Sequence, residues 1–162
     1  TYFHNAAVLR RIILEDPTGV WHRMLSVFIA ARQLGAGVTA GYAAQAVVAL
    51  AVAIVVVIAW VRDVPQPAKN VMLVLGACLA TPYVQDYDLV IGAFVVVWLA
   101  TLYPEGKMPT PVLIGAGLIL IVPFLASLLA KQTGLEWGPL FIAPAFMIVT
   151  LQTLRAKEKR TA

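Results

Sequence analysis

The sequence contains few charged residues and almost no cysteine. Only 12% of its 162 residues are charged, whereas 61% are hydrophobic, and the mean hydropathy is +0.87. A soluble domain of this length carries more charge, so we expect a polytopic membrane protein. The single cysteine, Cys78, lies in an apolar run. It excludes an internal disulfide framework and a cysteine-based zinc site, and we interpret it as a small core residue.

Several enzyme motifs are also missing. The chain has no glycine-rich phosphate loop, no His-Glu-x-x-His pair and no Gly-x-Ser-x-Gly elbow. His4 and His22 stand apart, and we interpret each as an interfacial polar residue rather than a ligand. We therefore expect no metal and no cofactor. The net charge of +4 does not indicate nucleic-acid binding, because most basic residues stand at helix ends or in one amphipathic stretch, where they suit anionic lipid headgroups.

The most informative stretch that is present is Leu79–Leu89, with the sequence LATPYVQDYDL. It places two carboxylates, two tyrosines, a glutamine and a proline between apolar runs. An ionisable side chain at mid-membrane costs about 2.5–3.5 kcal/mol, and such residues are more often functional than incidental. The alternative is a plain turn at the membrane interface.

The segment around this stretch predicts a bent helical hairpin with arms 70–82 and 86–103. The 34 residues from Asn70 to Tyr103 would form a helix of about 51 Å, too long for one crossing of a core about 30 Å thick and too short for two full spans. We expect Thr81 to cap the second arm and Pro82 to open it.

Three further apolar runs, 38–61, 111–130 and 137–154, predict spans. With the hairpin, residues 37–154 form an all-α membrane bundle of about five crossings, and 155–162 form a basic cytoplasmic tail. The side richer in lysine and arginine is expected to be cytoplasmic, so the hairpin tip and residues 1–36 lie outside. The loops of the outer side hold only Lys131. The cytoplasmic side holds seven basic residues, which are Arg62, Lys69, Lys107, Arg155, Lys157, Lys159 and Arg160.

Residues 1–36 predict two short amphipathic helices on or beside the bilayer. Asp16 is placed to cap the second helix, Pro17 to open it and Gly35 to end it. A folded loop packed on the spans is the alternative. The segment has four arginines on the outer side, which suggests that they hold a phosphate or a lipid headgroup; otherwise the crossing count is wrong by one. These are Arg10, Arg11, Arg23 and Arg32.

One grouping of side chains follows from this arrangement. Asp86 and Asp88 at the hairpin tip share a membrane face with the stretch Trp21–Ser26. Carboxylates and tyrosines can bind sugar hydroxyls, and arginine can bind a phosphate. Helical spacing turns Asp86 and Asp88 to different sides, so we expect them to have different tasks.

These residues carry a resemblance to a known family. Trp21–Ser26 with Leu34-Gly35, then Gln45 early in a span, then Ala80–Tyr83 and Asp86–Leu89 resemble the C-terminal part of glycosyltransferase family 87. Members are polytopic transferases of the GT-C type that use a polyprenyl-phosphate-linked mannose. The resemblance covers about residues 18–103.

The resemblance implies an inverting, metal-independent or weakly metal-dependent hexosyl transfer to a glycan or lipid acceptor on the extracytoplasmic face of a bacterial-type plasma membrane. An acidic general base is expected upstream of this chain. We therefore expect a C-terminal fragment that is inactive alone and has no catalytic residue. The candidate substrate-binding residues are Asp86, Asp88, Tyr83, Tyr87, Gln85, Trp21, His22, Arg23 and Ser26.

Two other functions remain open from the sequence. Bent helices with intramembrane acids also occur in secondary transporters and flippases, although no inverted repeat is visible. A structural membrane subunit without a site is the third possibility. An acidic pair after an upstream first span would favour the transferase, whereas a second copy of the bent pattern would favour the transporter.

Overall fold

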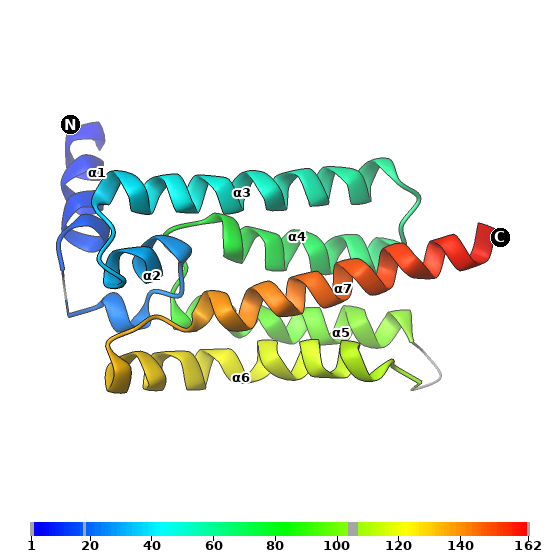
Figure 1. Cartoon of the computed structure of the whole chain (residues 1–162). Helices are drawn as coiled ribbons and strands as arrows, with labels where there is room; N and C mark the ends of the chain where they lie inside the picture. The colour runs from blue at the N-terminus through cyan, green and yellow to red at the C-terminus, as the bar shows by residue number, and fades with distance from the viewer. Residues whose placement is uncertain (1, 18, 104–106, 162) are drawn as a thin grey trace.

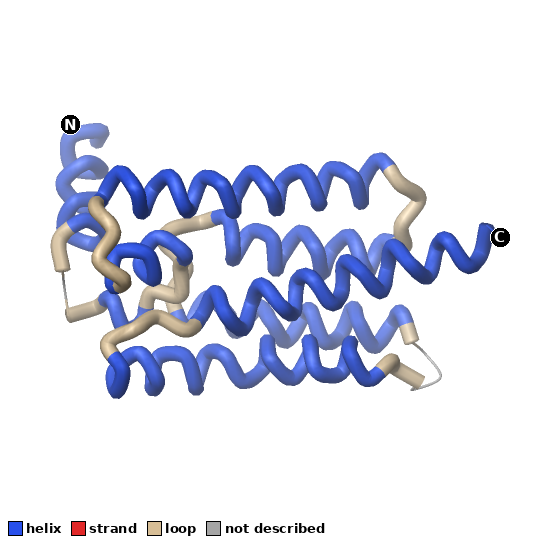
Figure 2. The backbone as a smooth tube through the Cα atoms, viewed as in Figure 1, coloured by secondary structure: helices blue, strands red, loops and turns tan. Residues whose placement is uncertain are grey.

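The computed structural model describes residues 2–17, 19–103 and 107–161. This part of the chain is helical and contains no β-strand, as the sequence predicts (Figure 2). Short helical turns connect or extend seven α-helices. In chain order the elements are α1 (Tyr2–Arg10), the π-helical turn η1 (Arg11–Glu15), the 3-10 turn η2 (Trp21–Arg23), α2 (Val27–Gln33), α3 (Val38–Val61), α4 (Gln66–Ala80), the 3-10 helix η3 (Asp86–Ile91), α5 (Gly92–Leu102), α6 (Thr110–Thr133) and α7 (Gly138–Thr161).

The long helices α3 to α7 run alongside one another, and α1 lies across the end of this bundle at which α2 is also found (Figure 1). The bend between α4 and η3 and the loop between α6 and α7 lie at that same end. The opposite end carries the α3–α4 connection, the end of α5, the start of α6 and the end of α7. The N-terminal segment and the hairpin bend therefore lie at one end, as expected.

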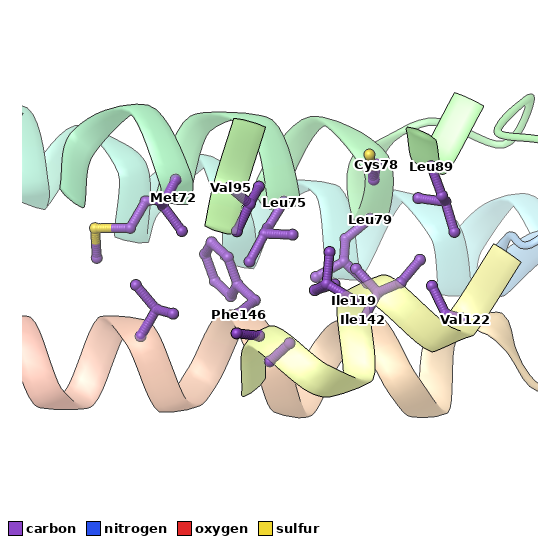
Figure 3. Packing of buried hydrophobic residues seen from close by; sticks show 14 of the residues in the cluster. Met72, Leu75, Cys78, Leu79, Leu89, Val95, Ile119, Val122, Ile142 and Phe146 are labelled. Carbon is purple, nitrogen blue, oxygen red and sulfur yellow. The ribbon is translucent and has the colours of Figure 1, made fainter. Parts of the chain in front are cut away.

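The bundle is held together by one large apolar core. Leu75 and Leu79 of α4 point toward Ile119 of α6 and toward Ile142 and Phe146 of α7 (Figure 3). Helix α7 thus packs between α4 and α6. A smaller cluster of Leu14, Met24, Phe28 and Ile29 holds the N-terminal segment together at the end of the bundle.

Two helices of the described part, α3 and α6, are long and apolar enough to cross a membrane, fewer than the five crossings predicted. The arms of the hairpin do not qualify, because α4 has 15 residues and the second arm is divided into the 3-10 helix η3 of 6 residues and α5 of 11 residues. Helix α4 extends about 22 Å against a hydrocarbon core of about 30 Å, while α5 extends about 16 Å and η3 adds about 12 Å to the second arm.

The bounds of the long helices agree only in part with the sequence. Helix α3 coincides with the predicted span 38–61. Helix α4 begins at Gln66 rather than Asn70, because Pro67 is tolerated in a first helical turn. Helix α7 continues to Thr161, so the backbone of the predicted tail 155–162 is helical up to that residue; Ala162 and the side chains of the tail lie outside the described part.

The prediction of a second amphipathic helix is wrong for the first half of that segment. Asp16 ends η1 and caps no second helix, since its amide donates to the Arg11 carbonyl at 2.9 Å. The backbone is extended at Met24, which forms an isolated antiparallel bridge with Gln85. The Leu25 amide donates to the Val84 carbonyl at 2.9 Å. This pairing with the bend competes with a continuous helix, and α2 starts only at Val27.

Candidate functional site

The bend of the hairpin, residues 81–88, is formed by a proline and by two residues that cap the ends of the helices on either side of it. Helix α4 ends at Ala80, because Pro82 disfavours helical geometry at the residue before it. Thr81 is extended, and its hydroxyl accepts from the Tyr83 amide at 3.2 Å. Thr81 therefore ends the first arm and does not cap the second, contrary to the prediction. The second arm is capped by Asp88, whose Oδ2 accepts from the Gln85 amide at 2.9 Å.

The structure joins the N-terminal segment to the bend through Arg23 and Asp86. The Arg23 Nε donates to both carboxylate oxygens, at 3.2 and 3.1 Å, and Nη2 donates to Oδ1 at 3.0 Å. Asp86 raises the pKa of Arg23 through this hydrogen-bonded contact. The guanidinium also lies 5.8 Å from the centre of the Tyr87 ring. Arg23, Asp86 and Tyr87 thus form one group, and such bidentate pairs fix geometry as well as charge.

Asp88 faces a pocket that Asp86 does not line. Helical spacing predicts this divergence, and the structure confirms it, since Asp86 binds Arg23 instead. The pocket has a volume of about 360 Å³, within the range of small ligand sites. Its polar side chains come from Thr81, Tyr83 and Asp88. The lining residues are Ala77, Cys78, Thr81, Tyr83, Val84, Asp88 and Ile91.

The other candidate residues make contacts within the N-terminal segment or between this segment and the bend. The Trp21 Nε1 donates to the Ile13 carbonyl at 3.2 Å, and its ring lies under the Arg32 guanidinium. Ser26 is buried and caps α2 by accepting from the Ile29 amide at 3.2 Å. His22 is half-buried in η2, and Gln85 pairs through its backbone with Met24. The side chain of His4 lies outside the described part.

Gln45 ties the N-terminal segment to the bundle, a role that the sequence does not reveal. Its side chain is 4% exposed. Its Oε1 accepts from the Phe28 amide at 3.0 Å, and its Nε2 donates to the Leu79 carbonyl at 2.8 Å. The first group belongs to the start of α2 and the second to the last turn of α4, and neither is bonded within its own helix. Gln45 thereby holds α2 beside the bend.

Sequence reasoning missed Glu136, which is buried in the loop between α6 and α7. The side chain is 5% exposed, and its Oε1 accepts from the Gly138 amide at 2.7 Å, at the start of α7. Its Oε2 has no hydrogen-bond partner in the described residues. The pKa of Glu136 is raised to about 8, mainly by burial; the charge of Asp86 acts in the same direction, and the backbone amides of Gly138 and Trp137 act against it. The sequence does contain a pattern that could have identified Glu136, because an acidic residue directly before Trp-Gly-Pro is placed to cap the next helix.

The raised pKa of Glu136 makes folding stability depend on pH. The folded chain holds this proton up to a pKa of about 8, whereas the ordinary value is 4.5. The penalty for a buried charge is absent below the ordinary pKa, grows as pH rises between the two values and is complete above the higher one. We expect the melting temperature of the chain in detergent to fall over this window, and to fall less in Glu136→Gln. Asp63→Asn, an exposed acid at the other end, is the control; parallel curves for wild type and Glu136→Gln would contradict the assignment.

The Arg23–Asp86 pair should contribute little to stability. The Arg23 side chain is 47% exposed and the Asp86 side chain 15% exposed, so solvent screens the pair from the side of the arginine. We expect Arg23→Gln to change the melting temperature by no more than about 3 °C. Arg62→Gln, at the opposite end of the bundle, is the matched control. A much larger drop for Arg23→Gln alone would make the pair a structural clamp.

No group of three or more His, Cys, Asp or Glu in the described part is arranged to hold a metal ion. Comparisons with protein-family models, with curated proteins and with solved structures find no match for this chain. They assign it to no family. The observations that bear on function are therefore the Arg23–Asp86 pair, the pocket beside it and the apolar bundle that carries both.

Proposed function

We propose that this chain is the C-terminal part of an integral-membrane glycosyltransferase of the GT-C type. It would move mannose, or another hexose, from a polyprenyl-phosphate donor to a glycan or lipid acceptor. One observation carries the proposal: Arg23 and Asp86 form a bidentate pair next to a pocket with Asp88, at one end of an apolar helix bundle. A cation for phosphate and carboxylates for sugar hydroxyls are the groups that such a donor needs.

Each side chain of the site has a separate chemical task in this proposal. Arg23 binds the donor phosphate, with Asp86 holding the guanidinium in position until the phosphate arrives. Asp88 accepts hydrogen bonds from sugar hydroxyls in the pocket, and the Tyr83 hydroxyl can donate or accept there. The apolar walls of the pocket suit the first part of a prenyl chain.

The proposed enzyme crosses the membrane about five times, with its C-terminus in the cytoplasm. Helices α3 and α6 are full spans, and the shorter α4 and η3–α5 are the arms of the bent hairpin. The positions of Arg62, Lys69 and Lys107 support this orientation. Arg62 follows α3, Lys69 lies in the first turn of α4 and Lys107 precedes α6, and these helix ends lie away from the bend (Figure 1). The short arm α4 would leave the bend below the outer surface, facing protein and water.

A transfer assay on the full-length parent protein tests the proposed function. Membranes containing the protein are given radiolabelled polyprenyl-phosphate-mannose, and membranes lacking it are the control. We expect protein-dependent transfer of the label to a glycan or lipid product, and none from a nucleotide-linked mannose in membranes that cannot make the lipid donor. An absence of transfer from polyprenyl-phosphate-linked mannose and glucose alike would contradict the proposal.

A further inference from the structure

A second, smaller pocket lies between α2 and the start of α7. Its volume is about 110 Å³, enough for several water molecules or a short organic group. Five of its six lining residues are apolar, and the sixth is Glu136. Apolar side chains also border it on the outside, since Leu34 is 74% exposed and Leu140 is 64% exposed. The lining residues are Ala30, Leu34, Leu135, Glu136, Trp137 and Leu140.

Glu136 gives this pocket an unmet chemical requirement. One carboxylate oxygen caps α7, and the other has no partner in the described residues. None of the salt bridges in the described part involves Glu136. A buried carboxylate without a cation is strongly unfavourable, and burial accordingly raises the pKa of Glu136, so that the empty site holds a proton at neutral pH in place of a cation.

We propose that this pocket binds a primary ammonium group carried by an aliphatic chain. In the empty pocket Glu136 keeps its proton at neutral pH, and it would release this proton to water as the ammonium enters. The ammonium would then donate a charge-assisted hydrogen bond to Oε2 of Glu136, while the chain lies over Leu34 and Leu140. The ethanolamine headgroup of a lipid has this chemistry, and so does a small free alkylamine. This site is separate from the proposed sugar-transfer site, and the two proposals can fail independently.

The chemistry of the pocket predicts its selectivity. A trimethylammonium group has no N–H, so a choline headgroup cannot satisfy Oε2 and is also bulkier. An anionic group brings no N–H donor and no positive charge that would favour the ionised form of Glu136. An alcohol can donate a hydrogen bond but brings no charge, and hydrogen bonds to charged groups are the stronger ones.

Native mass spectrometry of the full-length protein in detergent tests the site. The protein is titrated with phosphatidylethanolamine or with phosphatidylcholine of the same acyl chains, and butylamine is added in a competing series. We expect phosphatidylethanolamine to bind at least tenfold more tightly than phosphatidylcholine, and butylamine to displace it. Glu136→Gln keeps the acceptor for the Gly138 amide and should lose this preference, while Asp63→Asn keeps it.

The variants Ala30→Phe and Glu136→Gln together separate an effect on binding from an effect on folding. Ala30→Phe fills the pocket while leaving Glu136 in place, and it should also abolish the preference for ethanolamine. If butylamine binds in a Glu136-dependent way and phosphatidylethanolamine does not, the ligand is a free amine. Equal binding of both lipids together with no Glu136-dependent binding of butylamine, or an unchanged preference in a folded Glu136→Gln variant, would overturn the proposal.

Discussion

Replacing Gln45 with alanine is expected to destabilise the folded chain by about 2–6 kcal/mol, because it leaves two buried backbone groups without partners. These groups are the Phe28 amide at the start of α2 and the Leu79 carbonyl at the end of α4. Each unsatisfied buried group costs about 1–3 kcal/mol. The effect would be large for one side chain, since whole domains are stable by only about 5–15 kcal/mol.

Thermal unfolding in detergent measures this effect, and Gln66→Ala is the matched control. Gln66 is an exposed glutamine that bonds only to Asn70 among the described contacts, at 2.8 Å. Its removal should change the melting temperature little. Equal melting temperatures for Gln45→Ala and Gln66→Ala would show that Gln45 does not hold α2 to the bundle.

The parts of the fold that the sequence predicts are those decided by local pattern. Helix α3 keeps its predicted bounds, since 24 uncharged residues form it without interruption. The divergence of Asp86 and Asp88 follows from their spacing alone. The sequence predicts that Arg23 and Asp86 share a membrane face, but it does not predict their ion pair. That contact depends on how two segments distant in the sequence pack at the end of the bundle.

The errors arise where a distant segment decides the local structure. The second amphipathic helix fails at Met24 because its backbone pairs with Gln85. Thr81 ends an arm instead of capping one, because the extended residues after it reach Leu25 through Val84. No local pattern contains these contacts. The partners of Gln45 and the burial of Glu136 are non-local in the same way.

Neutralising the carboxylates of the bend is expected to have the largest effect on activity. In the proposed enzyme Asp88 binds sugar hydroxyls, and Asp86 positions the arginine that binds phosphate. A hydrogen bond to a charged group contributes about 1.5–3 kcal/mol, which corresponds to about tenfold or more in rate when it acts in the transition state. The amide of asparagine keeps the shape of each side chain and removes its charge.

The most direct test is therefore the transfer of labelled mannose from polyprenyl-phosphate-mannose in membranes of the full-length parent. Wild type is compared with Asp86→Asn, Asp88→Asn and the control Asp63→Asn at matched protein levels. We expect about a tenfold or greater loss in Asp88→Asn, a clear loss in Asp86→Asn and wild-type transfer in Asp63→Asn. Full activity in both bend variants would contradict the account and make residues 81–88 only a turn between two helices.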